Sequence, residues 1–152
     1  MKLSNIIQKT GVVTDTMTIG EAFAECVRNN VPGIPYVDAT GKVIGTFSIR
    51  RTLLSSCIPD VMVAYADLLG DDPGCLKIPE QNALKLLSLP ANSFIDKHFI
   101  AVSSDTAISK TIALMENHKI NYLFVIDEGK YLGVITIDGI ANRMLELAHD
   151  SH

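Results

Sequence analysis

What the 152-residue chain lacks excludes several classes of protein. It has no excess of basic residues, because 13 Lys and Arg face 17 Asp and Glu and give a net charge of −4. We therefore expect no nucleic-acid partner. No run of 18 or more apolar residues occurs, so we expect no transmembrane helix and no membrane partner. The start, Met1–Asn5, is followed by polar residues rather than by an apolar secretory core.

Cysteine is scarce as well. The three cysteines, Cys26, Cys57 and Cys75, are odd in number and far apart in the sequence. This pattern does not suit a disulfide framework and indicates reduced residues. The sequence therefore predicts a cytoplasmic protein.

Motifs of catalytic chemistry are missing too. The four histidines show no metal-ligand spacing with the cysteines, and neither CxxC nor HExxH occurs. No GxSxG nucleophile elbow and no glycine-rich phosphate loop is found. A metal-dependent hydrolase would need a ligand cluster that the sequence does not show. We expect no catalytic residue, no metal site, no cofactor and no enzymatic activity.

What the chain does have is an internal repeat. Gly45–Arg50 and Gly133–Asp138 each run from a glycine through a short apolar strand to a hydroxyl residue and a predicted helix. Residues 107–127 align with the earlier chain at an offset of 89, and the segments after a one-residue deletion align at 88. The order helix, strand, glycine turn, strand, helix is kept throughout, which indicates a duplication. With 47% hydrophobic residues, the chain can fill a core.

Local signals predict the elements of both units. In the first, Thr18 and Glu21 form a capping box, and Asn29–Asn30 ends the helix that follows. A short lead-in helix near Leu3–Ile7 and a strand near Val12–Val13 are expected before it. The remaining predictions are strands at 34–37 and 43–47, then in the second unit a strand at 100–102, a helix at 108–117, strands at 123–126 and 131–135, and a closing helix at 138–148.

The middle of the chain predicts two further helices. Pro59 opens one over 61–69 and Pro90 ends another over 79–87, with a break at 70–74 between them. Apolar residues cover more than one face of the first, which indicates burial either at a dimer seam or in the core of one chain. We therefore divide the chain into a first repeat with its lead-in (1–58), a helical insertion (59–93) and a second repeat (94–152).

The two units resemble the tandem cystathionine-β-synthase (CBS) domain pair, or Bateman module. Thr18–Thr52 and Ala107–Ile140 carry the resemblance, each ending in the glycine–apolar–hydroxyl junction. It implies an α+β fold of two pseudo-symmetric βαββα repeats packed through their sheets. It also implies a regulatory module, commonly a homodimer, that binds AMP, ADP, ATP or S-adenosylmethionine in the clefts between repeats and signals to a client protein.

The same resemblance implies where a ligand would bind. Two stretches match the cleft walls, two match the strand edges that read the base, and the two junctions supply hydroxyl and charged groups. The implied ligand-binding residues are Val13, Thr14, Val102 and Ser103 for the walls, Val31, Ile34, Pro35, Asn121, Tyr122 and Leu123 for the edges, and Ser48, Arg50, Arg51, Thr136 and Asp138 for the junctions.

The junctions depart from the family pattern. The acid that holds a ribose diol is replaced by Arg51 in one repeat and by Gly139 in the other. Asp138 either reaches the cleft or simply favours the helix dipole. Arg50 and Arg51 either clamp an anion or form a solvated pair bonded to an acid.

Ser48 and Thr136 suit helix caps, and a capping hydroxyl can also contact a ligand. The junction residues therefore leave two hypotheses open. One is a ligand-sensing module, and the other is a structural or protein-interaction module that has lost its nucleotide.

Overall fold

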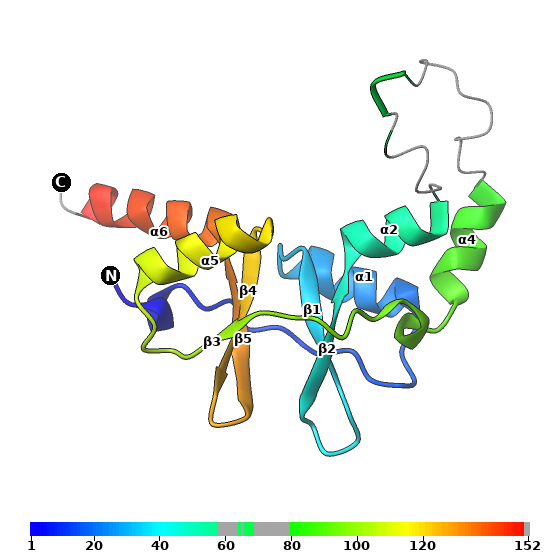
Figure 1. The fold of residues 1–152 in the computed structure, drawn as a ribbon, viewed down its shortest axis with the longest axis horizontal. Helices are drawn as coiled ribbons and strands as arrows, with labels where there is room; N and C mark the ends of the chain where they lie inside the picture. The colour runs from blue at the N-terminus through cyan, green and yellow to red at the C-terminus, as the bar shows by residue number, and fades with distance from the viewer. Residues whose placement is uncertain (58–63, 65, 69–79, 151–152) are drawn as a thin grey trace.

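Two α+β units lie side by side in the computed structural model, which describes residues 1–57, 64, 66–68 and 80–150 (Figure 1). Their hairpins meet in the middle of the molecule, and their helices lie on one side of the hairpins. The elements are η1 (Leu3–Asn5), α1 (Ile19–Arg28), β1 (Gly33–Val37), β2 (Val43–Ser48) and α2 (Ile49–Cys57) in and before the first unit, η2 (Ala66–Leu68), α4 (Glu80–Ser88) and η3 (Ala91–Phe94) between the units, and β3 (Ala101–Val102), α5 (Ile108–His118), β4 (Tyr122–Asp127), β5 (Lys130–Thr136) and α6 (Ile137–Asp150) in the second.

The helix boundaries follow the local signals. The predicted capping box is confirmed at α1, where Thr18 Oγ1 accepts from the Glu21 amide at 3.2 Å and the Glu21 carboxylate accepts from the Thr18 amide. Both α1 and α5 end through a left-handed residue, Asn30 (φ 54°) and Lys119 (φ 55°). These two residues are equivalent in the repeat alignment, so the helix ends are duplicated in backbone geometry although their side chains differ.

The hairpins are the predicted ones, and the lead-in is simpler than predicted. β1 pairs with β2 and β4 with β5, both antiparallel, and β3 adds to β4 in parallel. The short helix at the start is only the 3-10 turn η1, and the strand expected near Val12–Val13 is a single bridge from Val13 to Tyr36. Repeat one therefore keeps only a trace of the first strand that repeat two has as β3.

The two units pack through their sheets, because successive residues of β4 are buried in different cores. Leu123 and Val125 are buried with the helices of their own unit, whereas Phe124 is buried in the core of the first unit. Aromatic rings gather where the sheets meet, with Phe124 5.8 Å from Tyr122 and 6.0 Å from Tyr131 between ring centroids. Successive strand residues face opposite sides, so one strand can serve both cores.

Two crossing segments connect the units. The lead-in pairs Gln8 with Val134 of the second unit, and then Val13 with the first. In the reverse sense, the segment after η3 pairs Asp96 with Thr46 of the first unit before it enters β3. Figure 1 shows the two segments running across the hairpins in opposite directions.

The insertion packs on the first unit where it is described. The predicted helix at 79–87 is confirmed as α4, and the carbonyl of Leu89 accepts from the Ile19 amide at the start of α1 (2.8 Å). The amide of Ala91 donates to the carbonyl of Met17 (2.9 Å). The helix predicted over 61–69, with its proposed dimer seam, lies mainly outside the described residues.

Candidate functional site: a cleft between the two repeats

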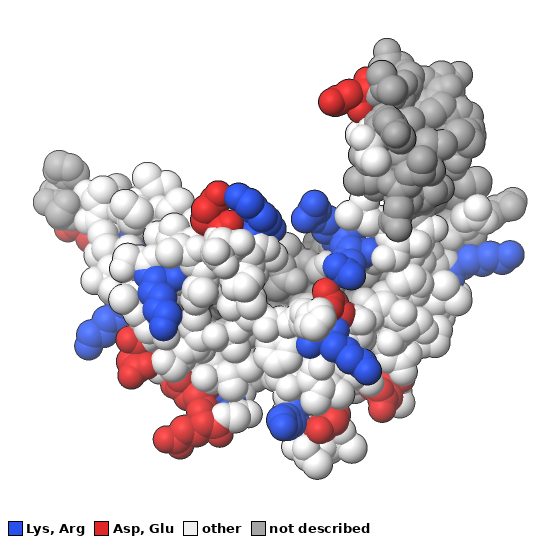
Figure 2. All heavy atoms as spheres, viewed as in Figure 1, with Lys and Arg blue, Asp and Glu red and all other residues white. Residues whose placement is uncertain are grey.

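A cavity of about 890 Å³ lies between the start of α2 and the end of α5. Its third wall is the crossing segment from Asp96 to Ile100. Figure 2 shows the hollow on this face, with basic side chains on both of its sides. The volume is in the range of small-molecule sites, so this cleft is the candidate site.

Aromatic side chains line the cavity between its two charged sides. Phe124 is buried, and the rings of Phe99 and Tyr122 lie 6.2 Å and 5.8 Å from it between centroids. The Tyr122 hydroxyl lies 3.2 Å from Thr46 Oγ1, and burial of the ring raises the pKa of Tyr122. The ring fits because the facing position is Gly33, where an added Cβ would lie 2.6 Å from the tyrosine oxygen.

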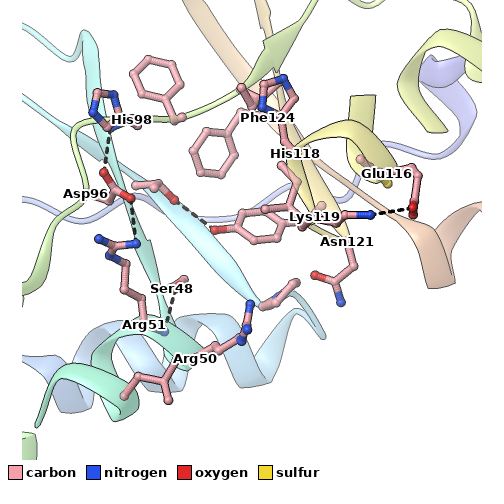
Figure 3. A pocket seen from close by; sticks show the side chains of 18 residues that line it. Ser48, Arg50, Arg51, Asp96, His98, Glu116, His118, Lys119, Asn121 and Phe124 are labelled. Carbon is pink, nitrogen blue, oxygen red and sulfur yellow. Dashed lines mark hydrogen bonds and ion pairs between the residues drawn. The ribbon is translucent and has the colours of Figure 1, made fainter. Parts of the chain in front are cut away.

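The start of α2 presents a hydroxyl and two arginines. Ser48 caps the helix, because its Oγ accepts from the Arg51 amide at 3.0 Å. Arg51 pairs with Asp96 at 3.3 Å, and the same carboxylate accepts from the His98 amide at 2.9 Å. Arg50 points away from that pair (Figure 3) and, within the described residues, its guanidinium forms no ion pair.

The end of α5 faces these arginines. Lys119 Nζ pairs with Glu116 at 2.8 Å, and both side chains are exposed. His118 and Asn121 line the cavity beside them. Three basic side chains and two acidic ones therefore surround the opening, and only Arg50 lacks an acidic partner among the residues that the structure describes.

The cavity brings together one third of the residues that the resemblance implied. Those on its surface are Ser48, Arg50, Arg51, Asn121 and Tyr122. The remaining implied residues, which are not part of this lining, are Val13, Thr14, Val31, Ile34, Pro35, Val102, Ser103, Leu123, Thr136 and Asp138.

Several of the implied residues outside this cavity have packing or local hydrogen-bonding roles. Val13, Ile34 and Leu123 are buried in the two cores. Thr136 caps α6, because its Oγ1 accepts from the Gly139 amide at 2.8 Å. Asp138 is exposed in the first turn of that helix. The capping roles expected of Ser48 and Thr136 are therefore both present.

Sequence reasoning missed the residues of the crossing segment and of the α5 end. Asp96, His98 and Phe99 enter the cavity because Asp96 pairs with Thr46, which lies far away in the chain. Glu116 and Lys119 had one available signal, since α5 was predicted to end beside them. The pairing of Asp96 with Thr46 had no local signal.

The described part of the chain holds no group of three or more His, Cys, Asp or Glu side chains that could bind a metal. Cys26 is a buried thiol whose pKa is raised to about 12, first by burial and then by the charge of Glu25. No helix among the described residues is long and apolar enough to span a membrane.

Comparisons with known proteins agree with this fold. No curated protein sequence matches the chain significantly. Among solved structures, a protein described as an acetoin utilization protein (AcuB) from Vibrio cholerae has a TM-score of 0.66 at 20% identity, covering 100% of this chain and 98% of that one.

Two further solved structures are similar. The CBS domain of a CBS domain-containing membrane protein from Sphaerobacter thermophilus has a TM-score of 0.64 at 16% identity, over 93% of this chain and 86% of that one. The CBS domain pair of protein MJ0100, in complex with 5′-methylthioadenosine and S-adenosyl-L-methionine, has a TM-score of 0.60 at 17% identity, over 95% and 99%.

The family assignment rests on the sequence of both units. The CBS domain model matches twice, at residues 4–53 and 91–146, which together make up more than half of the chain. The two matched stretches are the two α+β units, each with the crossing segment that leads into it. The chain belongs to the CBS domain family and carries two CBS domains in tandem.

Proposed function

We propose that this CBS pair is a non-catalytic regulatory module that binds an adenosine nucleotide or a related anion in the cleft between its repeats. The observation that carries the proposal is Arg50, a cation without an acidic partner among the described residues, beside an aromatic wall. Aromatic rings suit a base, and an arginine at a helix start suits a phosphate or carboxylate.

Two other features support this proposal. The start of α2 lies at the edge of the cleft, where the helix dipole favours a negative group. One solved CBS pair of the same fold was crystallised with 5′-methylthioadenosine and S-adenosyl-L-methionine. A ligand that contacts both α2 and α5 would favour one packing of the repeats over others. This packing would then signal to a client protein, from a cytoplasmic homodimer.

An alternative function is favoured by the Arg51–Asp96 pair. Arg51 stands where the family places a ribose-binding acid, and it instead ties α2 to the crossing segment. In that case the module is a structural or protein-interaction unit, and its cleft takes no nucleotide. The two functions differ in what a nucleotide does to stability.

The test is the thermal unfolding midpoint with and without AMP, ADP, ATP and S-adenosylmethionine at millimolar concentration. A ligand at about 100 times its dissociation constant stabilises by about 2.7 kcal/mol. We expect one of the four to raise the midpoint, and Arg50→Ala to remove most of the gain. Lys97→Ala is the matched control, because Lys97 is an exposed cation of the crossing segment outside the cavity lining. No gain with any of the four would contradict nucleotide sensing.

A further inference from the structure

The two carboxylates that line the cavity are both already paired. Asp96 pairs with Arg51 at 3.3 Å and also accepts from the backbone amide two residues further on, at 2.9 Å. Glu116 pairs with Lys119 at 2.8 Å. The cavity lining contains no other Asp or Glu among the residues that the structure describes. A positively charged ligand would therefore have to compete with an arginine or a lysine for its partner.

Arg50 is in the opposite situation. Its side chain is exposed at the cavity, and it has no acidic partner in the described part of the chain. Figure 3 shows its guanidinium directed away from Asp96 and toward the wall that carries Asn121, another exposed residue of the lining. A guanidinium and a side-chain amide both donate hydrogen bonds, and the guanidinium can bind two phosphate oxygens at once. The opening is therefore prepared for an anion.

The aromatic wall cannot make the same distinction. The rings of Phe99, Tyr122 and Phe124 offer the same surface to the adenine of any adenosine compound. Such compounds differ in the group on the 5′ carbon, which is a phosphate chain in AMP, ADP and ATP. In 5′-methylthioadenosine this group is an uncharged thioether, and in S-adenosylmethionine it carries a sulfonium and an ammonium beside one carboxylate. The choice among these ligands therefore depends on the charges at the opening.

We infer that the cleft selects nucleoside phosphates and discriminates against 5′-methylthioadenosine and S-adenosylmethionine, with Arg50 as the selecting residue. This inference rests on the proposed function and narrows its ligand. A phosphate gains a charge-assisted hydrogen bond from a guanidinium that gives up no partner within the described chain. A sulfonium finds no unpaired carboxylate in the described lining. The solved MJ0100 pair, by contrast, was crystallised with 5′-methylthioadenosine and S-adenosyl-L-methionine.

Calorimetric titration of the full chain with AMP and with 5′-methylthioadenosine tests the selection, because the two share adenosine and only AMP carries a phosphate. A hydrogen bond to a charged group is worth about tenfold or more in an equilibrium. We therefore expect AMP to bind at least about tenfold more tightly than 5′-methylthioadenosine or S-adenosylmethionine. Added salt should weaken AMP alone, because it screens an exposed charge pair. Equal affinity for AMP and either of the other two would overturn the inference and leave adenosine binding in place.

The role of Arg50 is tested by Arg50→Glu, which supplies the unpaired carboxylate that the cavity lacks. A glutamate in the first turn of α2 is favoured by the helix dipole, so the variant should fold. We expect AMP to lose at least about tenfold in affinity, 5′-methylthioadenosine to be unaffected, and S-adenosylmethionine to bind more tightly than AMP. Lys97→Ala, at an exposed cation outside the lining, should change none of the three. Unchanged AMP affinity in Arg50→Glu would overturn the selection by Arg50.

Inorganic pyrophosphate separates a failure of this inference from a failure of the proposed function. If no adenosine compound binds the wild type, nucleotide sensing fails whatever pyrophosphate does. Pyrophosphate binding that Arg50→Glu abolishes and Lys97→Ala preserves would still support selection for phosphate at this opening. A wild type that binds neither the adenosine compounds nor pyrophosphate would overturn both proposals.

Discussion

The two repeats of this chain share a backbone frame and differ in a few side chains at equivalent positions. In both, a crossing segment pairs with the second strand of a hairpin, Gln8 with Val134 in one case and Asp96 with Thr46 in the other. At the cavity an ion pair joins Arg51 to Asp96. At the other crossing the equivalent residues are Gly139 and Gln8, and neither carries a charge.

A second difference lies where the two sheets meet. Gly33 and Tyr122 are equivalent in the repeats, and the ring of one packs on the bare backbone of the other. The ring therefore lines the open cavity because its counterpart has no side chain. Duplication preserves the backbone pairings, and the replacement at this pair of positions gives Tyr122 its place in the cavity lining.

The largest loss of stability is expected when a crossing segment is forced away from the strand with which it pairs. Gly45 and Gly133 are equivalent, and an added Cβ would lie 2.8 Å from the Asp96 carbonyl oxygen at the first and 2.5 Å from the Gln8 carbonyl oxygen at the second. Backbone atoms cannot move aside cheaply, so we expect Gly45→Ala and Gly133→Ala each to cost about 2–4 kcal/mol. Denaturant unfolding at equilibrium measures the cost.

Gly129→Ala is the control for this pair of substitutions. Its φ of 80° strains an alanine, yet an added Cβ would meet nothing within 4 Å. The expected cost is about 1 kcal/mol, from backbone conformation alone. A cost at Gly45 or Gly133 no larger than at Gly129 would show that the crossing segments are loosely held.

The next effect concerns the hydroxyl that ties the lead-in to β5 of the second unit. The Tyr131 hydroxyl lies 2.6 Å from Thr10 Oγ1, and the Tyr122 hydroxyl lies 3.2 Å from Thr46 Oγ1. We expect Tyr131→Phe to cost about 1 kcal/mol and Tyr122→Phe to cost less, because its bond is longer. Equilibrium unfolding of the two variants tests the order, and the reverse order would contradict it.

The pH dependence of stability in the alkaline range gives a second test of the role of Tyr131. Burial raises the pKa of Tyr131 to about 12, from an ordinary value of 10.0. The folded state thus binds the phenolic proton more tightly than the unfolded state, so the contribution is full below pH 10 and is lost as pH rises toward 12. The stability of the wild type should fall more steeply over this range than that of Tyr131→Phe.

The next prediction concerns the two turn aspartates and the stability that each contributes as the pH falls. Asp38 and Asp127 are equivalent, and hydrogen bonds lower both pKa values, chiefly from Thr40 to Asp38 and from Ser104 to Asp127. Because the folded-state pKa is lowered, each contributes stability above the ordinary value of 3.8 that is lost as pH falls through the folded-state pKa.

The hydrogen-bond donors to the two aspartates lie at different distances along the chain. Thr40 belongs to the same turn as Asp38, whereas Ser104 lies before α5 and is joined to the end of β4 by Asp127. We therefore expect Asp127→Asn to destabilise more than Asp38→Asn at neutral pH. Unfolding curves measured across pH should show that the loss of stability in each variant disappears in acid, where the wild-type aspartate is protonated. Equal losses, or losses that persist in acid, would contradict this account.

The sequence predicts the elements better than it predicts the cleft, for a physical reason. Helix starts and hairpins depend on residues close in the sequence. The Thr18–Glu21 capping box and the glycine turns can therefore be predicted from local patterns. The cleft depends on contacts between distant residues, such as Asp96 with Thr46, that have no local signal. Residues expected to line a cleft, such as Val13 and Ile34, are instead used to fill the core.

The smallest expected effect belongs to the ion pair between Arg51 and Asp96 at the cavity. Arg51 is 65% exposed, and its distance to Asp96 is 3.3 Å. Exposed pairs contribute about 0.2–1 kcal/mol, because water screens the attraction and ordering a long side chain costs entropy. A double-mutant cycle with Arg51→Ala and Asp96→Ala measures the coupling. Because Asp96 also accepts from the His98 amide, Asp96→Ala alone should cost more than Arg51→Ala.

The same cycle, repeated with a bound nucleotide, relates this pair to the cleft. If an anion draws Arg51 away from Asp96, the coupling between the two residues should shrink when the ligand is present, because the arginine is then shared between two negative groups. If the pair is only structural, the ligand leaves the coupling unchanged. An unchanged coupling together with a loss of affinity in Arg50→Ala would assign anion binding to Arg50 and leave Arg51 as the tie between α2 and the crossing segment.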